Sequence, residues 1–579
     1  MAKYIFVVGG VISGVGKGIT SASIGKILQA RGLRVTAIKI DPYVNVDAGT
    51  MNPTEHGETF VLDDGTECDQ DMGNYERFLD QDLSRDNYMT TGSIYLSVIN
   101  RERNLGYNGR CVEVVPDIPL EVIRRIQAAE KKNRADVVIV EIGGTAGEYQ
   151  NILFLEAVRI LKIKRPKDVL LILVSLVPSL SAGGTELKTK PTQYAARTLN
   201  AGGLQADLIF GRAPIALDEK RREKIAFVCG LASKDDVISA PNARSVYEVA
   251  LNFEKVKLSD RILHKLDIKP RATDLKEWRQ MVAAINDSEK IVKIGIVGKY
   301  FDSGNFMLED SYISVIEAIK HAGARIKVKP EIIWLNAEEF EKDPRRVRDL
   351  ARYDGIIVPG GFGSRGVEGK IRVARYCREH QIPYFGLCYG MQIATVEYAR
   401  DVLGWQDAHT TEIDPKTKHP VIDIMPEQKK NLISKNYGAT MRLGAYPTQL
   451  KKGTIAAHAY GTLSISERHR HRYEVNPEFI VQLEKAGLVF SGISPNRKLM
   501  EVAELPRDKH PFFLGTQFHP ELKSRPLRPH PLFVEFLKSA SNAAYGEEEQ
   551  KTKTTSKQPA QKLKKRNKKT LRVLVKKNK

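Results

Sequence analysis

The chain of 579 residues carries 90 Lys and Arg against 70 Asp and Glu, a formal net charge of +20 at pH 7, and 42% of its residues are hydrophobic. This length predicts at least two domains with sizeable cores. Five cysteines without a repeating spacing exclude a disulfide framework and a structural zinc site, so we expect a reducing, cytoplasmic setting.

The positive charge is concentrated at the C-terminus. Residues 551–579 contain 13 Lys or Arg and no acidic residue, so they carry most of the net charge. We expect residues 546–579 to form a disordered basic tail, through which alone the protein would bind nucleic acid or an acidic surface. The longest apolar runs, 4–15 and 168–180, are too short for a bilayer, so we predict no membrane segment.

The first predicted elements are a buried strand over residues 3–8, a glycine-rich turn and a helix over 19–29. The turn ends in Lys17. Backbone N–H groups and the helix N-terminus would face an anion that the lysine neutralises, so the pattern is typical of a phosphate-binding loop. The spacing departs from the strict G-x-x-x-x-G-K-[ST] pattern, because Gly18 replaces Ser or Thr. A purely structural glycine turn is the alternative.

Polar side chains end the next predicted strands. Lys39 and Asp41 end the strand 34–40, and Glu141 ends the strand 136–142. Parallel α/β sheets bind ligands at the carboxyl ends of their strands, so we expect these residues to face a ligand. A carboxylate opposite a phosphate loop, as at Glu141, is a typical Mg²⁺ ligand, and Asp71 could join it. A solvated turn carboxylate is the alternative for Asp71.

Two further strands are predicted at 169–177 and 208–211. The first is followed by Lys188 and Lys190, which suit a second phosphate chain, although a solvated basic loop explains them equally well. Lys224 lies in a helical stretch, 220–229. The alternation of strands and helices predicts a doubly wound α/β domain over residues 1–268, followed by a helical linker over 269–291.

A second α/β domain is predicted over residues 292–545, with strands at 292–297, 326–328 with 332–334, 355–358 and before Cys388. Gly386 and Gly390 bracket this cysteine between a strand and a helix. Such a turn is a nucleophile elbow, in which glycines permit the strained backbone and the helix N-terminus favours a thiolate.

The other parts of a thiol-dependent site follow in the same domain. If His519 and Glu521 lie two apart on extended chain, they share a face, and the carboxylate can orient the imidazole as a base. The turn at Gly360 and Gly361 can present N–H groups to an oxyanion. A buried, inert cysteine is the alternative, but the combination favours a nucleophile.

The stretches 358–363, 383–393 and 518–521 resemble class I glutamine amidotransferases, which release ammonia from glutamine through a thioester. Together with 3–18, 39–43, 73–78, 141–145 and 188–193, they occur in the order found in the CTP synthase family, over about residues 1–540. The resemblance implies a P-loop-type synthetase domain joined to a class I amidotransferase domain. It implies that UTP is phosphorylated on its 4-oxygen by ATP and aminated to CTP, the last step of de novo CTP synthesis, by ammonia from L-glutamine or from solution.

The resemblance also implies the site residues. For the glutaminase reaction they are Cys388, His519 and Glu521. For ATP they are Ser13, Gly14, Val15, Gly16, Lys17, Gly18, Ile19, Lys39 and Asp71, and for Mg²⁺ they are Asp71 and Glu141. For UTP and CTP they are Ser13, Glu148, Tyr149, Gln150, Lys188, Thr189, Lys190, Pro191, Thr192, Gln193 and Lys224. For glutamine they are Gly361, Tyr389, Gly390, Met391, Gln392, Glu412 and Arg472.

Regulation and assembly are implied as well: GTP as an allosteric activator acting through a mobile loop at Arg365 and residues 366–370, CTP as a feedback inhibitor, and a homotetramer. His56 resembles a residue that gates the ammonia passage. The family usually has Asp-Ile-Glu where this chain has Glu148, Tyr149 and Gln150, which leaves pyrimidine recognition and CTP inhibition open. Another glutamine-dependent P-loop amidoligase is the alternative function.

Overall fold

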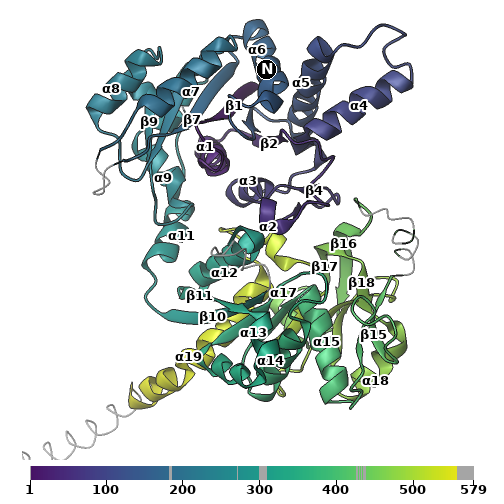
Figure 1. Ribbon diagram of the computed structural model, residues 1–579. Helices are drawn as coiled ribbons and strands as arrows, with labels where there is room; N and C mark the ends of the chain where they lie inside the picture. The colour runs from purple at the N-terminus through teal and green to yellow at the C-terminus, as the bar shows by residue number, and fades with distance from the viewer. Residues whose placement is uncertain are drawn as a thin grey trace, which may run out of the picture.

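The computed structural model describes residues 2–180, 186–269, 271–298, 309–425, 428, 431, 433 and 438–556. Two α/β parts follow each other along the chain. The N-terminal part extends from β1 to α11 and the C-terminal part from β10 to α19 (Figure 1). No helix among the described residues is long and apolar enough to cross a membrane.

The N-terminal part contains a parallel sheet with strand order β5-β2-β6-β1-β7-β8-β9. The strands are β1 (Lys3–Gly10), β2 (Val35–Asp41), β5 (Tyr88–Thr90), β6 (Val137–Ile142), β7 (Val169–Leu176), β8 (Leu208–Ala213) and β9 (Val237–Pro241). A small hairpin pairs β3 (Phe60–Val61) with β4 (Glu67–Cys68). The large sheet's strands are apolar along most of their length because helices cover both faces.

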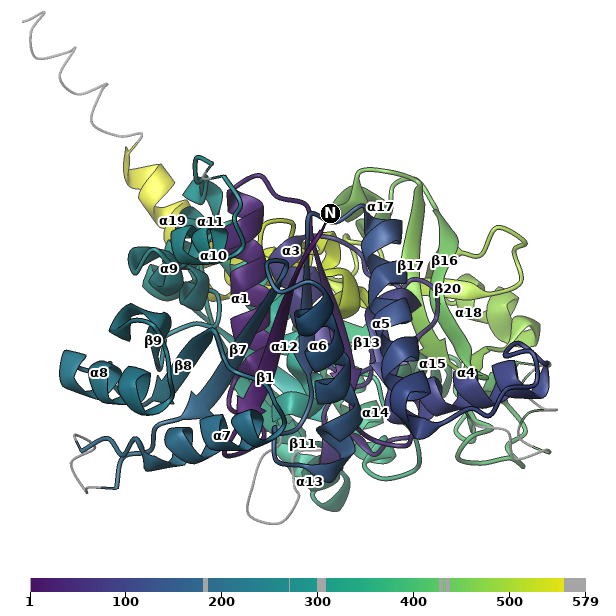
Figure 2. The ribbon, with the colours of Figure 1, turned by 90° about the horizontal axis from the view of Figure 1, so that it is seen from above.

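Two apolar cores lie on the two faces of this sheet. Ile5 and Val7 point into one core and Phe6 and Val8 into the other. The helices on the face toward the C-terminal part are α1 (Lys17–Ala30), α3 (Asp71–Leu79), α9 (Glu248–Lys255), α10 (Leu258–Lys265) and α11 (Lys276–Asp287). Those on the other face are α4 (Thr91–Arg103), α5 (Val114–Asn133), α6 (Ile152–Lys164), α7 (Lys190–Ala201) and α8 (Glu219–Val228), and α5, α6 and α7 lie nearest the viewer in Figure 2.

The C-terminal part is built on a mixed sheet with order β11-β10-β12-β13-β21-β20-β19-β16-β17. Its parallel strands are β10 (Ile291–Gly298), β11 (Lys329–Asn336), β12 (Gly355–Val358), β13 (Tyr384–Leu387) and β21 (Phe513–Thr516). Its antiparallel extension is β20 (Met500–Glu504), β19 (Val489–Ile493), β16 (Arg442–Leu450) and β17 (Ser464–His471). A small sheet holds β14 (His409–Thr410), β15 (Pro420–Ile424) and β18 (Tyr473–Val475).

Helices cover both faces of this sheet too. One core includes residues of α13 (Ala337–Lys342), α14 (Val367–Glu379), α15 (Tyr389–Asp401) and α18 (Ile480–Lys485). The other includes residues of α12 (Ile313–Ile326), α17 (Ile455–Tyr460) and α19 (Pro531–Ser556). The predicted fold class, two consecutive α/β parts, is therefore confirmed.

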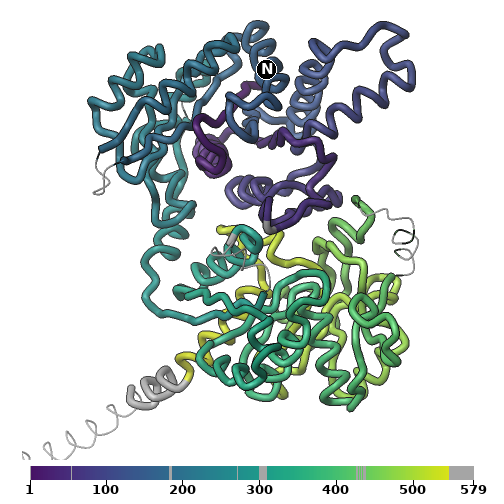
Figure 3. Tube along the Cα trace, viewed as in Figure 1, coloured from purple at the N-terminus to yellow at the C-terminus, as the bar shows by residue number. Residues whose placement is uncertain are grey.

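Two details differ from the predictions, and the helix predicted in the linker is present. The strand predicted at 326–328 is wrong: α12 continues to Ile326, the left-handed C-cap residue Lys327 (φ 59°) turns the chain, and β11 begins at Lys329. In the predicted linker, α11 packs Trp278 and Met281 into the N-terminal core, and the chain leads from it into the C-terminal part (Figure 3). The helix α19 continues to Ser556, into the segment expected to be disordered, since Glu, Gln and Lys favour helix. Residues 557–579 of that segment lie outside the described residues.

Candidate active sites

The glycine loop between β1 and α1 brings Lys17 toward the carboxyl edge of the sheet. Gly14 and Gly16 have positive φ angles of 69° and 91°, which glycine adopts without steric cost. The helix α1 then begins at Lys17, whose Nζ donates a 2.7 Å hydrogen bond to the carbonyl oxygen of Gly144. Burial lowers the pKa of Lys17. The loop thus presents a buried cation beside a helix N-terminus, as a phosphate site requires.

The departure at Gly18 has a steric explanation. A Cβ atom on Gly18 would lie 2.0 Å from Oδ1 of Asp71, the first residue of α3. A Ser or Thr at this position would therefore displace the carboxylate that approaches the loop. The absence of a Ser or Thr side chain at Gly18 is therefore what allows the Asp71 carboxylate to lie close to the loop.

Lys39 joins the acidic residues into a buried cluster at the ends of β2 and β6. Its Nζ contacts the carboxylate of Asp71 and lies 3.1 Å from Oε1 of Glu141 and 3.7 Å from Oδ1 of Asp41. Burial lowers the pKa of Lys39, but the carboxylates outweigh burial and raise it well above its usual value. Burial also raises the pKa of Asp71 to about 6, against the opposing effect of Lys39. The sequence-predicted Lys39, Asp71 and Glu141 are therefore brought together.

The residues expected to contact UTP form two groups outside this cluster. Glu148 accepts a 2.8 Å hydrogen bond from the Thr145 backbone N–H and lies close to Gly144, beside Lys17. Tyr149, in contrast, is 91% exposed. The second group surrounds the start of α7, where the Thr192 hydroxyl is buried against Ser175, and Lys224 lies on the exposed side of α8.

The predicted nucleophile lies at a strained turn at the end of β13. Cys388 has φ 49° and ψ −96°, and α15 begins at the next residue. A Cβ atom on Gly390 would lie 2.1 Å from the Val358 carbonyl oxygen, so glycine is required for the close approach of α15 to β12. The elbow predicted from sequence is present in the structure.

His519 and Glu521 contact each other, although not through the expected backbone. Nδ1 of His519 lies 2.7 Å from Oε1 of Glu521. The extended chain expected between them is wrong: Pro520 begins a 3-10 helix, Pro520–Lys523, because its fixed φ suits a first helical position. Burial lowers the pKa of His519, but the Glu521 carboxylate and the Cys388 sulfur outweigh it and raise this pKa well above its usual value.

The predicted glutamine residues surround the elbow on several sides. Gln392, in α15, donates a 2.8 Å hydrogen bond to the Tyr473 carbonyl oxygen, and Glu412 accepts one of 2.7 Å from the Gly363 N–H. Met391 packs in the core beneath Gly515. Arg472 is buried and donates to Gln428 and Thr440. The remaining predicted positions lie in the same turn and helix start: Gly361, Tyr389 and Gly390.

A small cavity of about 80 Å³ joins the elbow to the N-terminal part. Cys388, His519, Glu521 and the turn from Pro359 to Phe362 line it from the C-terminal part, with Arg470, Leu522, Ser311, Tyr312 and Val315. Pro53, Glu58 and Thr59 line it from the N-terminal part. A cavity shared by the thiol site and the other half of the chain is a feature that no motif predicted.

Comparisons with known proteins agree over most of the chain. The family model described as CTP synthase N-terminus matches residues 3–268, and the model Glutamine amidotransferase class-I matches residues 307–539. The CTP synthase of Caldanaerobacter subterraneus subsp. tengcongensis is 48% identical over 94% of this chain and 99% of its own length. That of Pyrococcus furiosus is 50% identical over 93% of this chain and 98% of its own.

This chain belongs to the CTP synthase family. A solved structure of the glutaminase domain of Trypanosoma brucei CTPS with bound acivicin is 37% identical and covers 43% of this chain and 94% of its own, with a TM-score of 0.40. The matches to full-length CTP synthases and to a glutamine amidotransferase domain assign glutamine-dependent CTP synthesis to the chain. They favour this activity over that of another glutamine-dependent amidoligase.

Sequence reasoning did not identify the residues of one cavity that adjoins the glycine loop. A cavity of about 340 Å³ beside the glycine loop is lined by Gly16, Ile19, Arg212 and Asn242, among others. Arg212 lies near the carboxyl end of β8 and donates a 2.6 Å hydrogen bond to the Ala240 carbonyl oxygen. Because ligands bind at the carboxyl ends of parallel strands, the residues that end β8 and β9 were the part of the sequence that could have predicted this cavity.

Two predicted regulatory positions have defined partners in the enzyme. Nε2 of His56 lies 3.2 Å from Oδ2 of Asp69, whose hydrogen bond raises the pKa of His56. Within the predicted GTP-linked loop, Gly366 precedes α14 with a positive φ, and Nε of Arg365 lies 3.0 Å from Oε1 of Glu338.

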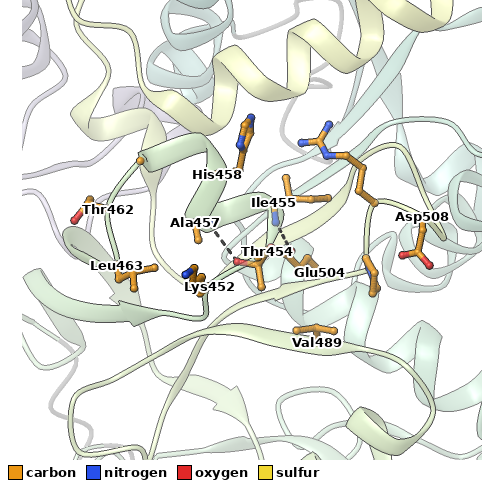
Figure 4. A pocket seen from close by; sticks show the side chains of 14 residues that line it. Lys452, Thr454, Ile455, Ala457, His458, Thr462, Leu463, Val489, Glu504 and Asp508 are labelled. Carbon is orange, nitrogen blue, oxygen red and sulfur yellow. Dashed lines mark hydrogen bonds between the residues drawn. The ribbon is translucent and has the colours of Figure 1, made fainter.

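A wide cavity of about 1100 Å³ lies elsewhere in the C-terminal part (Figure 4). Thr454, Ile455, His458 and Asp508 are among its lining residues, and none of the predicted site residues lines it. Glu504 accepts hydrogen bonds there from the N–H groups of Ile455 and Ala456, so its carboxylate serves the start of the short helix α17.

Proposed function

We propose that the N-terminal part activates UTP with ATP and that ammonia reaches it internally from Cys388. The observation that supports this proposal most directly is the cavity that contains Cys388 and is also lined by Pro53, Glu58 and Thr59 of the N-terminal part. Ammonia released into water becomes protonated and diffuses away, so a sheltered route preserves its nucleophilicity. The proposed division is a synthetase domain over 1–268, a linker over 269–291, an amidotransferase domain over 292–545 and a basic tail over 546–579.

In the glutaminase reaction, the Cys388 thiolate attacks the side-chain carbonyl carbon of glutamine. The C–N bond breaks, and His519 gives a proton to the leaving ammonia. Glu521 holds the imidazole through the 2.7 Å contact at Nδ1, which leaves Nε2 for this proton transfer. The Gly360–Gly361 turn supplies N–H groups for the oxyanion. The product is a thioester on Cys388, which water hydrolyses to glutamate and the free thiol.

In the synthetase reaction, the 4-oxygen of UTP takes the γ-phosphoryl group of ATP, and ammonia displaces that phosphate to give CTP. Lys17 and Lys39 neutralise phosphate charge, and the glycine loop binds phosphate oxygens through backbone N–H groups. The cavity lined by Gly16, Arg212 and Asn242 suits the adenosine end of ATP, because it adjoins the loop.

Asp71 and Glu141 are the residues that would hold Mg²⁺. Among the described residues no group of three or more His, Cys, Asp or Glu is arranged to hold a metal. Two carboxylates nevertheless fit the ion, because Mg²⁺ at nucleotide sites takes its other oxygen ligands from phosphates and water. Gly18 leaves room for Asp71 beside the loop, as such a shared site requires. Bound there, the ion would offset negative charge on the transferred phosphoryl group.

The remaining roles concern UTP, regulation and assembly. Glu148 to Gln150, Lys188 to Gln193 and Lys224 bind UTP and, in inhibition, CTP, while GTP acts through Arg365 and residues 366–370. Exposed apolar side chains support a homotetramer that completes the UTP site between subunits; they include Leu96, Ile99, Leu105, Val114, Tyr149 and Phe227. The five free cysteines support a cytoplasmic location.

The ammonia route leads from Cys388 past Glu58 toward His56 and Asp69. Asp69 lies 3.9 Å from Lys39 Nζ, so the His56 pair borders the synthetase cluster. The proposal is tested by CTP formation from UTP, ATP, Mg²⁺ and glutamine, repeated with ammonium salt and with GTP. Amination of UTP as the sole acceptor from both nitrogen sources is expected. Glutamine hydrolysis without amination of UTP from either source would overturn it.

A further inference from the structure

Gln517 contacts the sulfur atom of the elbow cysteine. It follows β21 directly, two residues before His519, and its side chain is fully buried. Its Nε2 lies 3.6 Å from Sγ of Cys388, within hydrogen-bonding distance of sulfur. Its backbone N–H donates to the Glu501 carbonyl oxygen at 2.8 Å, which fixes the chain at this position.

A chain of hydrogen bonds determines which end of the Gln517 amide faces the sulfur. The Tyr473 carbonyl oxygen can only accept, so the amide nitrogen of Gln392 faces it at 2.8 Å. The same nitrogen lies 3.3 Å from Oε1 of Gln517 and donates to it. Because Oε1 of Gln517 is held in this way, its NH₂ group faces Cys388.

The sulfur has different partners in its two protonation states. As a thiol it can donate to the Arg470 carbonyl oxygen, 3.9 Å away. A thiolate cannot donate, and it is stabilised by groups that donate to it. Gln517 supplies such an N–H whether His519 is charged or neutral.

We propose that Gln517 is a further catalytic residue of the glutaminase site, which donates a hydrogen bond to the Cys388 thiolate and increases the thiolate fraction. This inference rests on the proposed role of Cys388 as nucleophile. The proposed function of Gln517, donation of a hydrogen bond to the thiolate, is separate from the roles of the elbow and of the His519–Glu521 pair.

Other charged groups also face the cavity around the sulfur. His519 and Glu521 come from the segment that follows β21, Arg470 comes from β17, and Glu58 comes from the N-terminal part. The Arg470 guanidinium is engaged by Glu67 at 2.8 Å. Glu58 accepts from Ser314. A test must therefore isolate the Gln517 contact from these charges, which a neutral replacement of similar length does.

The test compares Gln517→Met and Gln517→Glu with the wild-type full chain, and uses Gln449→Met as the matched control at an exposed position of β16. Iodoacetamide alkylates Cys388 without substrate across a pH series, and mass spectrometry of the Cys388 peptide gives the rate. In Gln517→Met we expect the acid limb of the profile to move up by about one pH unit, with alkylation about tenfold slower below that limb. Gln517→Glu should move it further, because a carboxylate repels the thiolate, while Gln449→Met should match wild type.

Coincident alkylation profiles for wild type and both Gln517 variants would overturn the proposal. A change in KM for glutamine without a change in the alkylation profile would also overturn it, because Gln517 would then only position Gln392. Thermal unfolding midpoints identify a misfolded variant. If Gln517→Met does not fold, Gln517→Glu provides the test, because its carboxylate can still accept the hydrogen bond from Gln392. Failure of the underlying assignment is distinguishable, since Cys388→Ala would then retain glutaminase activity.

Discussion

Glu76 and Arg468 form an ion pair between the two parts of the chain, with Oε2 of Glu76 2.7 Å from Nη1 of Arg468 and neither side chain exposed. Glu76 also pairs with Arg525 at 2.6 Å. Glu76 lies in α3, the helix that begins with Asp71. Arg525 lies just after the 3-10 helix Pro520–Lys523, which contains Glu521. One buried carboxylate therefore ties the helix of the proposed metal ligand to the segment that carries the proposed base.

Glu76→Gln should destabilise the joined structure strongly. Arg468 and Arg525 would lose the one fully buried carboxylate that both contact, and such a loss costs about 3–5 kcal/mol where no other partner remains. Asp82, whose side chain is 45% exposed, still contacts both guanidinium groups and offsets part of this cost. We expect the thermal unfolding midpoint to fall by several degrees and glutamine-fed CTP synthesis to fall more than ammonia-fed synthesis. Asp80→Asn is the matched control, because the Asp80–Arg528 pair also joins the two parts but is exposed. Equal midpoints for the two variants would contradict this assignment.

Cys388→Ala should separate the two proposed reactions. Loss of the nucleophile removes glutamine-fed CTP synthesis by at least ~10⁴-fold, because the residues of a covalent site act as a unit. Ammonia supplied from solution needs no thioester, so CTP formation with ammonium salt should persist. Both rates are measured by CTP formation at saturating UTP and ATP, with the exposed Cys111→Ala as control. Parallel loss of both activities would argue against two separate sites.

Gly18→Ala tests the explanation for the unusual glycine loop. The added Cβ would lie 2.0 Å from Asp71 Oδ1, so the carboxylate must move away from the loop and from Lys39. We expect at least ~100-fold slower CTP formation from either nitrogen source, since positioned charge supplies several kcal/mol in phosphoryl transfer. Glutamine hydrolysis, measured as glutamate release, should fall far less. Gly202→Ala adds a Cβ at an ordinary 3.4 Å contact and should leave both rates near wild type.

The partly buried Glu58 should make stability depend on pH. Burial raises the pKa of Glu58 to about 7, from an ordinary value of 4.5. Between these pH values the folded state therefore binds a proton that the unfolded state releases. The contribution of Glu58 to the free energy of unfolding is fully present below about pH 4.5 and is lost as pH rises through about 7. Relative to wild type, Glu58→Gln should gain stability from pH 5 to pH 8, by ~3 kcal/mol at most.

Thermal unfolding of both proteins across this pH range measures the difference. Glu55→Gln, at an exposed position three residues earlier, is the control and should follow the wild-type curve. A Glu58→Gln curve parallel to wild type at every pH would show that the carboxyl titrates normally.

Local sequence determined much of this protein. The glycine loop with Lys17, the elbow at Cys388, the polar ends of β2 and β6, and the division into two α/β parts each follow from patterns that span a few residues, because backbone turns and strand ends have short chemical signatures. His519 and Glu521 were also identified locally, although the backbone between them is helical rather than extended. Their carboxylate–imidazole contact needs only a two-residue separation and a turn that Pro520 permits.

The tertiary structure alone decided which distant residues meet. Gln517 beside Cys388, Glu58 at the wall of the thiol cavity, and Glu76 between Arg468 and Arg525 join residues more than a hundred positions apart. These polar side chains are buried or, for Glu58, partly buried. A single sequence does not reveal this, because burial arises only when the two sheets and their helices pack. The close approach of Asp71 to Gly18 likewise depends on how α3 is placed against α1.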